Sequence, residues 1–148
     1  MTVRQRQAAR VILFDERNRV LLIRFSITRR DGTVVFWATP GGGLEGDEDP
    51  LDGAKRELME ELGLDLPLTG PIHKATAVFE HEGALLENTD TFFLGRCAAS
   101  APRLDGVDDA ERKAMQTLRW WDADEIADSA EPIFPADLAE VVRRVARA

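Results

Sequence analysis

The residues best suited to do chemistry in this 148-residue chain are four glutamates between positions 48 and 61. Glu57, Glu60 and Glu61 stand at i, i+3 and i+4, so a helix places their carboxylates on one face. Glu48 precedes them at a distance that a loop can close. Carboxylates packed together repel one another, and a hard divalent cation with oxygen ligands relieves that repulsion. The spacing therefore predicts a site for Mg²⁺ or Mn²⁺.

A helix with clear ends is predicted to carry these groups. Asp49 is a good N-cap and Pro50 suits the first helical position, whereas Gly63 is a natural C-cap glycine. Gly53 is unfavourable inside a helix, which suggests that another backbone packs close to it. The face next to the carboxylates is apolar and is predicted to enter the core; it consists of Leu51, Ala54, Leu58 and Leu62.

The same segment resembles a known family motif. Upstream of the helix, Pro40-Gly41-Gly42-Gly43 can adopt positive φ and approach a ligand closely. The segment matches every fixed position of one motif, the Nudix box, with the spacing intact, and the matching residues are Gly42, Glu48, Arg56, Glu57, Leu58, Glu60, Glu61, Gly63 and Leu64. It therefore resembles the Nudix hydrolase family, and the segments around Trp37 and Leu118–Trp121 look like that family too. Asp47 stands where many members have glycine, with Gly46 one place earlier.

The resemblance implies roles for the box residues. It places metal ligation on Glu57 and Glu61, with Glu60 contributing directly or through water. Glu48 is implied as an outer contributor, and the Gly42 region as the source of a backbone carbonyl. Arg56 is expected to organise the carboxylates rather than to hold substrate. The implied catalytic set is accordingly Glu60, Glu57 and Arg56.

The general base is left open by the residues. Glu60 is the choice inside the box because it already lies on the metal face. The alternatives outside the box are Glu80, Glu82, Glu87 and Glu111.

The net charge of −8 bears on the substrate. An acidic surface repels nucleic-acid polymers, which need several cations against their phosphates. A small nucleotide then needs bound metal and a local positive patch, for which Arg24, Arg29 and Arg30 are the candidates. Trp37 is a candidate for stacking on a base, although core packing explains it equally well. Arg29 and Arg30 can alternatively belong to an exposed turn at Asp31-Gly32.

Three functions are compatible with the fold that the box implies. The first is a metal-dependent pyrophosphohydrolase in which activated water attacks a phosphorus of a nucleoside diphosphate derivative or a (d)NTP. The second is a nucleotide-binding sensor without turnover, and the third is an isoprenoid diphosphate isomerase. Retention of the box carboxylates favours the first. The isomerase needs a reactive cysteine, whereas Cys97 is predicted to be an inert core thiol.

Subfamily markers do not fix the substrate. One such marker is a tyrosine beyond the box, and the chain has no Tyr.

Length and composition predict the domain organisation and the location of the protein. A length of 148 residues with 44% hydrophobic residues fits one domain over 1–148. No apolar stretch is long enough to cross a bilayer and the first residues do not resemble a signal peptide, so we expect a cytoplasmic protein without membrane partners. One cysteine excludes an internal disulfide framework. Family members are often dimers, so the resemblance leaves a homodimer open.

The remaining patterns predict an α/β/α sandwich with a mixed β-sheet, which is also the fold that the resemblance implies. Trp120 and Trp121 alternate on a strand and are expected to be structural. His73 and His81 are expected to be strand or turn residues. The predicted strands are Ala8–Phe14, Val20–Phe25, Val34–Trp37, His73–Glu80, Asp90–Cys97 and Thr117–Trp121, with a polar connection over Ala98–Glu111. Asp122 is predicted to cap a short helix, and Pro135 to open a last helix with an apolar stripe of Leu138, Val141, Val142 and Val145.

Overall fold

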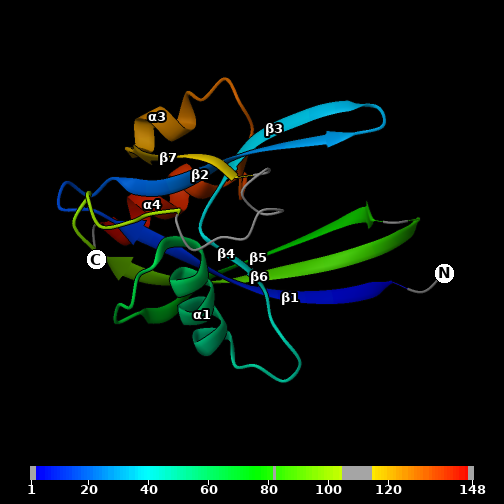
Figure 1. Ribbon diagram of the computed structural model, residues 1–148, viewed down its shortest axis with the longest axis horizontal. Helices are drawn as coiled ribbons and strands as arrows, with labels where there is room; N and C mark the ends of the chain where they lie inside the picture. Colours follow the sequence, from blue (N-terminus) through cyan, green and yellow to red (C-terminus); the bar gives the residue numbers. More distant parts are fainter. Residues whose placement is uncertain (1–2, 82, 105–114, 147–148) are drawn as a thin grey trace.

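The sheet is organised around β1 (Arg4–Phe14), whose last four residues, 11–14, are apolar on both faces and fully buried. In the computed structural model, which describes residues 3–81, 83–104 and 115–146, helices cover this sheet on either side (Figure 1). The other strands are β2 (Val20–Arg29), β3 (Gly32–Ala38), β4 (Gly41–Gly43), β5 (Thr69–His81), β6 (Ala84–Arg96), β7 (Met115–Trp121) and β8 (Ile133–Phe134). The helices are α1 (Pro50–Leu62), α3 (Ala123–Ala127) and α4 (Leu138–Ala146).

The described strands form one eight-stranded mixed sheet with the order β5-β6-β1-β2-β3-β8, in which β4 pairs with β1 and β7 with β2. The pairs β1–β6 and β3–β8 are parallel, and the others are antiparallel. The register between β1 and β2 contains one pair, Phe14 with Val20. Beyond that pair the sheet divides into a β1 arm (β1, β5 and β6) and a β2 arm (β2 and β3), which Figure 1 shows as separate ribbons.

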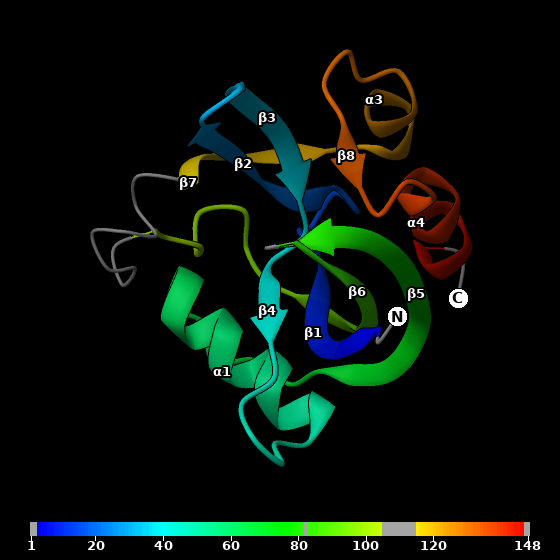
Figure 2. The same ribbon diagram turned by 90° about the vertical axis from the view of Figure 1, so that its right-hand side faces the viewer.

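Two apolar clusters attach the helices to opposite faces. Leu58 and Leu62 of α1 pack with Val11 and Leu13 of β1 on one face. On the other face the predicted stripe of α4 packs with Ile12 and its neighbours. Figure 2 shows α1 on one side of the strands and α3 and α4 on the other. The predicted α/β/α sandwich with a mixed sheet is confirmed.

The predicted strands are in the right order but too short. β1 begins at Arg4 rather than Ala8, and β2 continues to Arg29. β5 (Thr69–His81) and β6 (Ala84–Arg96) extend into the segment His81–Glu87 that was expected to join them. The extension of β1 is polar and exposed, whereas that of β6 has the adjacent apolar residues Leu85 and Leu86, both partly buried. Neither shows the half-buried alternation that marks a strand in the sequence. Backbone pairing continues along the arms nevertheless, because each arm supplies its own hydrogen-bonding neighbour.

Helix ends follow the local sequence closely. The Asp49 side chain accepts a hydrogen bond from the Leu51 N–H, and Gly63 ends α1 in the left-handed conformation with φ of 67°. Asp122 caps α3 through a capping box with Glu125. The last helix begins at Leu138 rather than at Pro135, since positions 135–137 form a turn.

The explanation expected for Gly53 was wrong. A Cβ at this position would meet the side chains of Leu44 and Glu48 rather than a backbone.

No helix in the described ranges is long and apolar enough to cross a membrane.

Candidate active site

Arg56 lies at the centre of the acidic residues of the box. Its Nε and Nη2 donate to the two carboxylate oxygens of Glu48 at 2.8 and 2.9 Å. Its Nη1 donates to Glu57 at 3.2 Å and to Glu60 at 3.1 Å. Nη2 also donates to the Gly43 carbonyl at 3.1 Å. One guanidinium thus connects the loop, β4 and α1, which is the geometry of an organising residue.

These contacts fix the charge states around Arg56. Its hydrogen bonds lower the pKa of Glu48, which is therefore ionised at neutral pH. The bond to Glu48 in turn raises the pKa of Arg56 above its ordinary value. Within the described part of the chain, no three acidic, histidine or cysteine side chains stand together in a metal-holding arrangement. In this conformation Arg56 is the cation among the carboxylates.

Glu61 is held separately, at the junction of α1 with the glycine strand. Its side chain is buried, and its Oε1 accepts a 2.7 Å hydrogen bond from the backbone N–H of Gly41. Gly41 has φ of +142°, and a Cβ there would collide with the Ala9 carbonyl. Only glycine can therefore bring this N–H to the carboxylate.

Gly42 leaves room for Glu57. A Cβ at Gly42 would lie 2.7 Å from Oε1 of Glu57, closer than real Cβ contacts allow. The pairing of β4 with Ala8–Arg10 of β1 keeps the glycine backbone at this position. The absence of side chains on β4 is thus what gives Glu57 its place beside the strand.

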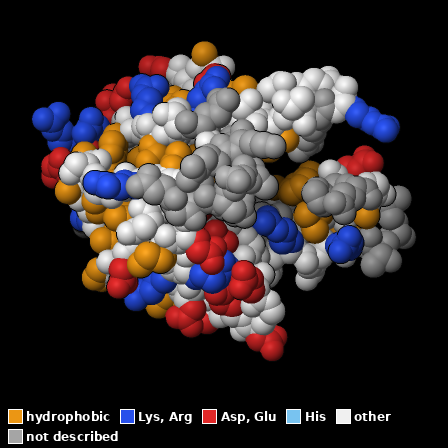
Figure 3. All heavy atoms as spheres, in the orientation of Figure 1, with side chains coloured by type: hydrophobic (Ala, Val, Ile, Leu, Met, Phe, Trp, Pro, Cys, Tyr) orange, Lys and Arg blue, Asp and Glu red, His pale blue; other side chains and the backbone are white. Residues whose placement is uncertain are grey.

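Glu57 and Glu61 line a cavity of about 410 Å³ that opens between the two arms of the sheet. The glycines of β4 lie beside them, and Met115 of β7 contributes from the β2 side. Figure 3 shows acidic side chains gathered over α1 and the loop before it, next to basic side chains on the neighbouring arm. Two further groups complete the lining: Phe25, Ile27, Phe36 and Ala38 from the β2 arm, and Arg6 and Arg10 from β1.

The wall from the β2 arm is aromatic. The rings of Phe25 and Phe36 stack with centroids 5.2 Å apart and an interplanar angle of 14°. Phe134 of β8 meets Phe36 edge-on at 5.6 Å and is 54% exposed. A planar ligand group can stack on such a surface.

The wall from β1 is basic. Nε of Arg10 lies 3.2 Å from Asp90, and its Nη1 donates to the Thr39 carbonyl at 3.0 Å. Nη1 of Arg6 donates to Asn88 at 3.0 Å. Among the residues that the structure describes, none places a carboxylate within 4.0 Å of the Arg6 guanidinium. Arg6 is therefore a cation balanced by a neutral amide.

The residues predicted to bind substrate lie elsewhere. Trp37 and Arg24 pair across β2 and β3, on the opposite face from Phe25 and Phe36. Arg24 binds both oxygens of Glu131 at 3.1 and 2.7 Å, and the Trp37 indole N–H donates to the same carboxylate at 2.9 Å. Trp37 is 6% exposed and packs edge-on against Trp121, so it belongs to the core on the α3 side.

Arg29 and Arg30 are at the far end of the β2 arm. Arg29 ends β2, where it pairs with Gly32, and Arg30 is exposed in the following turn. This is the surface-turn alternative considered from the sequence. Among the described side chains, that of Arg30 does not line the cavity around Glu57.

The candidates for the general base lie in different parts of the molecule. Glu60 is half exposed and held by Arg56 beside Glu57, although its own side chain is not part of the cavity lining. Glu80 and Glu87 lie on β5 and β6 and do not line the cavity. Glu82 and Glu111 lie outside the described residues.

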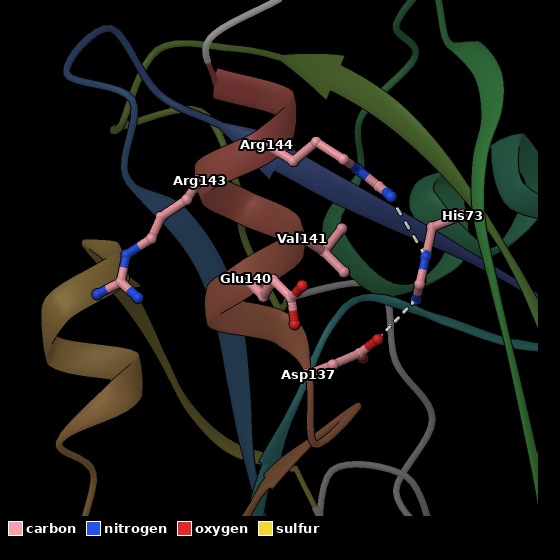
Figure 4. Close-up of a pocket in the computed structure, with 6 residues that line it drawn as sticks. All are labelled: His73, Asp137, Glu140, Val141, Arg143 and Arg144. Atoms are coloured by element: carbon pink, nitrogen blue, oxygen red, sulfur yellow. Dashed lines mark hydrogen bonds and ion pairs between the residues drawn. The ribbon is translucent and has the colours of Figure 1, made fainter.

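A second cavity, of about 530 Å³, lies between α4 and β5 and contains none of the box residues. In Figure 4 the His73 ring points between Arg144 and Asp137, while Arg143 points away toward α3. Nη2 of Arg144 lies 3.5 Å from Nδ1 of His73, and the opposite nitrogen lies 3.1 Å from Asp137. These contacts join the C-terminal helix to the β1 arm.

The remaining residues considered from the sequence are structural. Cys97 follows β6, packs against the α1-side cluster, and has its pKa raised to about 11, mainly by burial. Trp120 donates to the Ala99 carbonyl at 3.0 Å on one face, and Trp121 is buried on the other.

Comparison with known proteins identifies the domain. The sequence model described as the NUDIX domain matches residues 4–145. An RNA pyrophosphohydrolase of Bartonella henselae is 32% identical over 66 residues, which is 43% of this chain and 38% of that protein. An 8-oxo-dGTP diphosphatase of Proteus vulgaris is 36% identical over 55 residues, or 37% and 47% of the two chains. The aligned stretches cover less than half of each curated relative.

The fold is shared with solved structures over nearly the whole chain. The crystal structure of a MutT protein from Methanosarcina mazei Go1 superposes with a TM-score of 0.70 and 20% identity, covering 99% of this chain and 96% of that one.

Proposed function

The chain belongs to the NUDIX domain family, and from this membership we propose that it is a metal-dependent pyrophosphohydrolase acting on small nucleotides. The substrate is a nucleoside diphosphate linked to another group, or a (d)NTP, and the bond broken is a phosphoanhydride. One observation carries the proposal: Glu57 and Glu61 line the same cavity as a stacked pair of phenylalanines. Carboxylates for a cation and an aromatic surface for a base are thus present in one site.

The names of the relatives support the reaction class. The Bartonella protein is named a pyrophosphohydrolase and the Proteus protein a diphosphatase, and both names denote cleavage between phosphates. The first is named for RNA and the second for a nucleotide. We propose small nucleotides because the net charge of −8 is unfavourable for a polymer of phosphates.

The residues present fit a hard divalent cation. Glu57 and Glu61 supply carboxylate oxygens at the cavity, and the room that Gly42 leaves beside Glu57 would be filled by a Cβ. Carboxylates and backbone carbonyls are the ligands that Mg²⁺ and Mn²⁺ prefer. We propose that Glu57 and Glu61 hold the ion, with Glu60, Glu48 and the Gly42 carbonyl contributing around them. A bound ion of this kind activates water and neutralises charge on phosphoryl oxygens.

The chain's own residues supply positioning and proton transfer. Arg56 keeps the carboxylates of Glu48, Glu57 and Glu60 in one place by holding all three. Glu60 is proposed as the base that accepts the proton of the attacking water, since it is half exposed at the edge of this group. Phe25 and Phe36 hold the base of the nucleotide, and the bare backbone of β4 admits the phosphates next to the box.

The proposal is tested by incubating the protein with Mg²⁺ and a panel of dNTPs, 8-oxo-dGTP, ADP-ribose, NADH, nucleotide sugars, diadenosine polyphosphates and a triphosphorylated RNA oligonucleotide. Products are identified by chromatography. The expected result is metal-dependent cleavage of a phosphoanhydride bond in a small nucleotide. A triphosphate would release phosphate or pyrophosphate, whereas a linked diphosphate would give a nucleoside monophosphate and a phosphorylated second group. Cleavage of the RNA alone would overturn the proposed substrate class. Binding of nucleotides by calorimetry without any cleavage would assign the protein to the sensor class.

A further inference from the structure

Two arginines of β1 lie across the glycine strand from the box carboxylates. We propose that Arg6 and Arg10 form an anion subsite for a third phosphate, so that the preferred substrates carry at least three linked phosphates. This inference rests on the proposed function and narrows it. It favours nucleoside triphosphates over nucleoside diphosphates that are joined to a neutral sugar.

The first argument is position. A Cβ at Gly43 would lie 2.9 Å from Nη2 of Arg6, whereas a Cβ at Gly42 would lie 2.7 Å from Oε1 of Glu57. Successive residues of a strand direct their Cβ atoms to opposite sides. Arg6 and Glu57 therefore flank β4 from its two sides, and both line the cavity. A phosphate chain lying along β4 would have the carboxylate site on one side and the arginines on the other.

The second argument is hydrogen-bonding capacity. A guanidinium has five N–H donors in a planar fork. The contacts described above use Nε and Nη1 of Arg10 and Nη1 of Arg6. Among the described residues these contacts leave Nη2 of each arginine available to a ligand, and arginine binds phosphate oxygens in pairs. Asn88 is 7% exposed, accepts from Arg6 and donates to Asp90, which pairs with Arg10. These two residues therefore hold both arginines in place.

The third argument is charge balance. The protein has a net charge of −8. At the box, the positive charge of Arg56 is already balanced by the carboxylates of Glu48, Glu57 and Glu60. A metal ion held by the box would neutralise a diphosphate bound there, so a diphosphate alone would not need a further cation. Arg6 has no carboxylate partner among the described residues and therefore adds net positive charge to the cavity. A third phosphate supplies the charge that this arginine lacks, whereas a ribose or hexose does not.

The experiment compares substrates that share a base. Values of kcat/KM are measured for ATP against ADP-ribose and for GTP against GDP-mannose, with the unmodified protein and the variants Arg6→Gln and Arg6→Lys. We expect Arg6→Gln to lower the value for the triphosphates by about 10- to 100-fold, the worth of a charge-assisted hydrogen bond. The values for the sugar derivatives should change less than about twofold by the same reasoning. Arg6→Lys should recover part of the loss because it keeps the charge but not the fork.

Arg17→Gln is the matched control, because Arg17 is an exposed arginine in the turn between β1 and β2. It removes the same charge and should leave the ratio of kcat/KM between triphosphates and sugar derivatives unchanged. Equal losses for triphosphates and sugar derivatives in Arg6→Gln would overturn the subsite, and so would a preference of the unmodified protein for the sugar derivatives.

Calorimetry separates this inference from the proposed hydrolysis. The β,γ-imido analogue of ATP and ADP are titrated into the unmodified protein and into Arg6→Gln in the presence of Mg²⁺. Tighter binding of the analogue than of ADP, lost in Arg6→Gln, supports the subsite even if no substrate is cleaved. Equal affinities in the two proteins contradict it, whether or not turnover is found.

Discussion

The backbone N–H of Gly41 donates a 2.7 Å hydrogen bond to the buried carboxylate of Glu61. This bond ties the box helix to the strand that pairs with β1, so the acidic residues are positioned by the sheet as well as by their own helix. The contact also sets how the site should be tested. A glutamine at position 61 keeps an oxygen that can accept this hydrogen bond, whereas an alanine leaves the part-buried N–H of Gly41 without this partner, at a cost of about 1–3 kcal/mol.

Gly42→Ala should impair the site without unfolding the protein. The added Cβ would lie 2.7 Å from Oε1 of Glu57, so the carboxylate must move. We expect Mg²⁺-dependent kcat/KM to fall about 10- to 100-fold, as it does when the surroundings of a metal ligand are disturbed. The circular dichroism spectrum should be unchanged. In a Glu57→Gln background the same alanine should have no further effect, and an additive loss there would contradict this explanation.

Arg56→Met should make stability less dependent on acidity. The pKa of Glu48 is lowered from its ordinary value of 4.5, with the hydrogen bond from Arg56 as the first cause. A lowered pKa in the folded state gives stability that is present above 4.5 and is lost as the pH falls below it. Urea midpoints of the native protein and the variant should therefore differ most near neutral pH and converge below 4.5.

The matched control for this variant is Lys55→Met, which removes an exposed cation from the same helix. Its midpoint should follow that of the native protein at every pH. A gap between native protein and Arg56→Met that widens on acidification would show that Arg56 does not hold Glu48.

Cys97 should be a slow nucleophile. Burial raises its pKa from the usual 9.0 to about 11. The thiolate fraction at mildly alkaline pH is then about 100-fold lower than for a free cysteine. Alkylation by iodoacetamide should be slower in the folded protein by about this factor than in urea, as measured by mass spectrometry. Rapid labelling of the folded protein would reopen the isomerase, whose chemistry needs a reactive thiol.

Arg24→Gln should lower stability and leave substrate affinity unchanged. Arg24 binds both oxygens of Glu131, and Glu131 also accepts from the Trp37 indole, on the face of the sheet away from Glu57. The midpoint of thermal unfolding should fall, while KM for a cleaved nucleotide stays within about twofold, because the pair lies outside the cavity. Arg30→Gln, in the exposed turn, should change neither quantity. A raised KM in Arg24→Gln would place substrate on the α3 side.

Local pattern was enough to predict α1 and its acidic residues. Asp49, Pro50 and Gly63 act within one turn of the helix ends, and Glu57 to Glu61 share a face through helical periodicity alone. None of these features depends on where another segment of the chain lies. The apolar stripe of α4 was predictable for the same reason.

The walls of the cavity depend on long-range pairing, which the sequence does not display. Phe36 and Trp37 are neighbours on β3, and only the sheet decides that Phe36 faces Glu57 while Trp37 faces α3. Arg6 and Arg10 reach the cavity because β1 separates from β2 after a single pair. Their spacing by an even number of residues in a polar segment is consistent with one face of a strand, but it names no ligand.

The most direct test of this account is the turnover of Glu57→Gln and Glu61→Gln on a nucleotide that the native protein cleaves, at saturating substrate with Mg²⁺ and with circular dichroism on the same samples. The account predicts that kcat falls at least about 100-fold in each variant while the spectra match the native one, because each loses a charge that the proposed metal site requires. Native kcat in either variant with a native spectrum would contradict the assignment of Glu57 and Glu61 as the metal-holding pair.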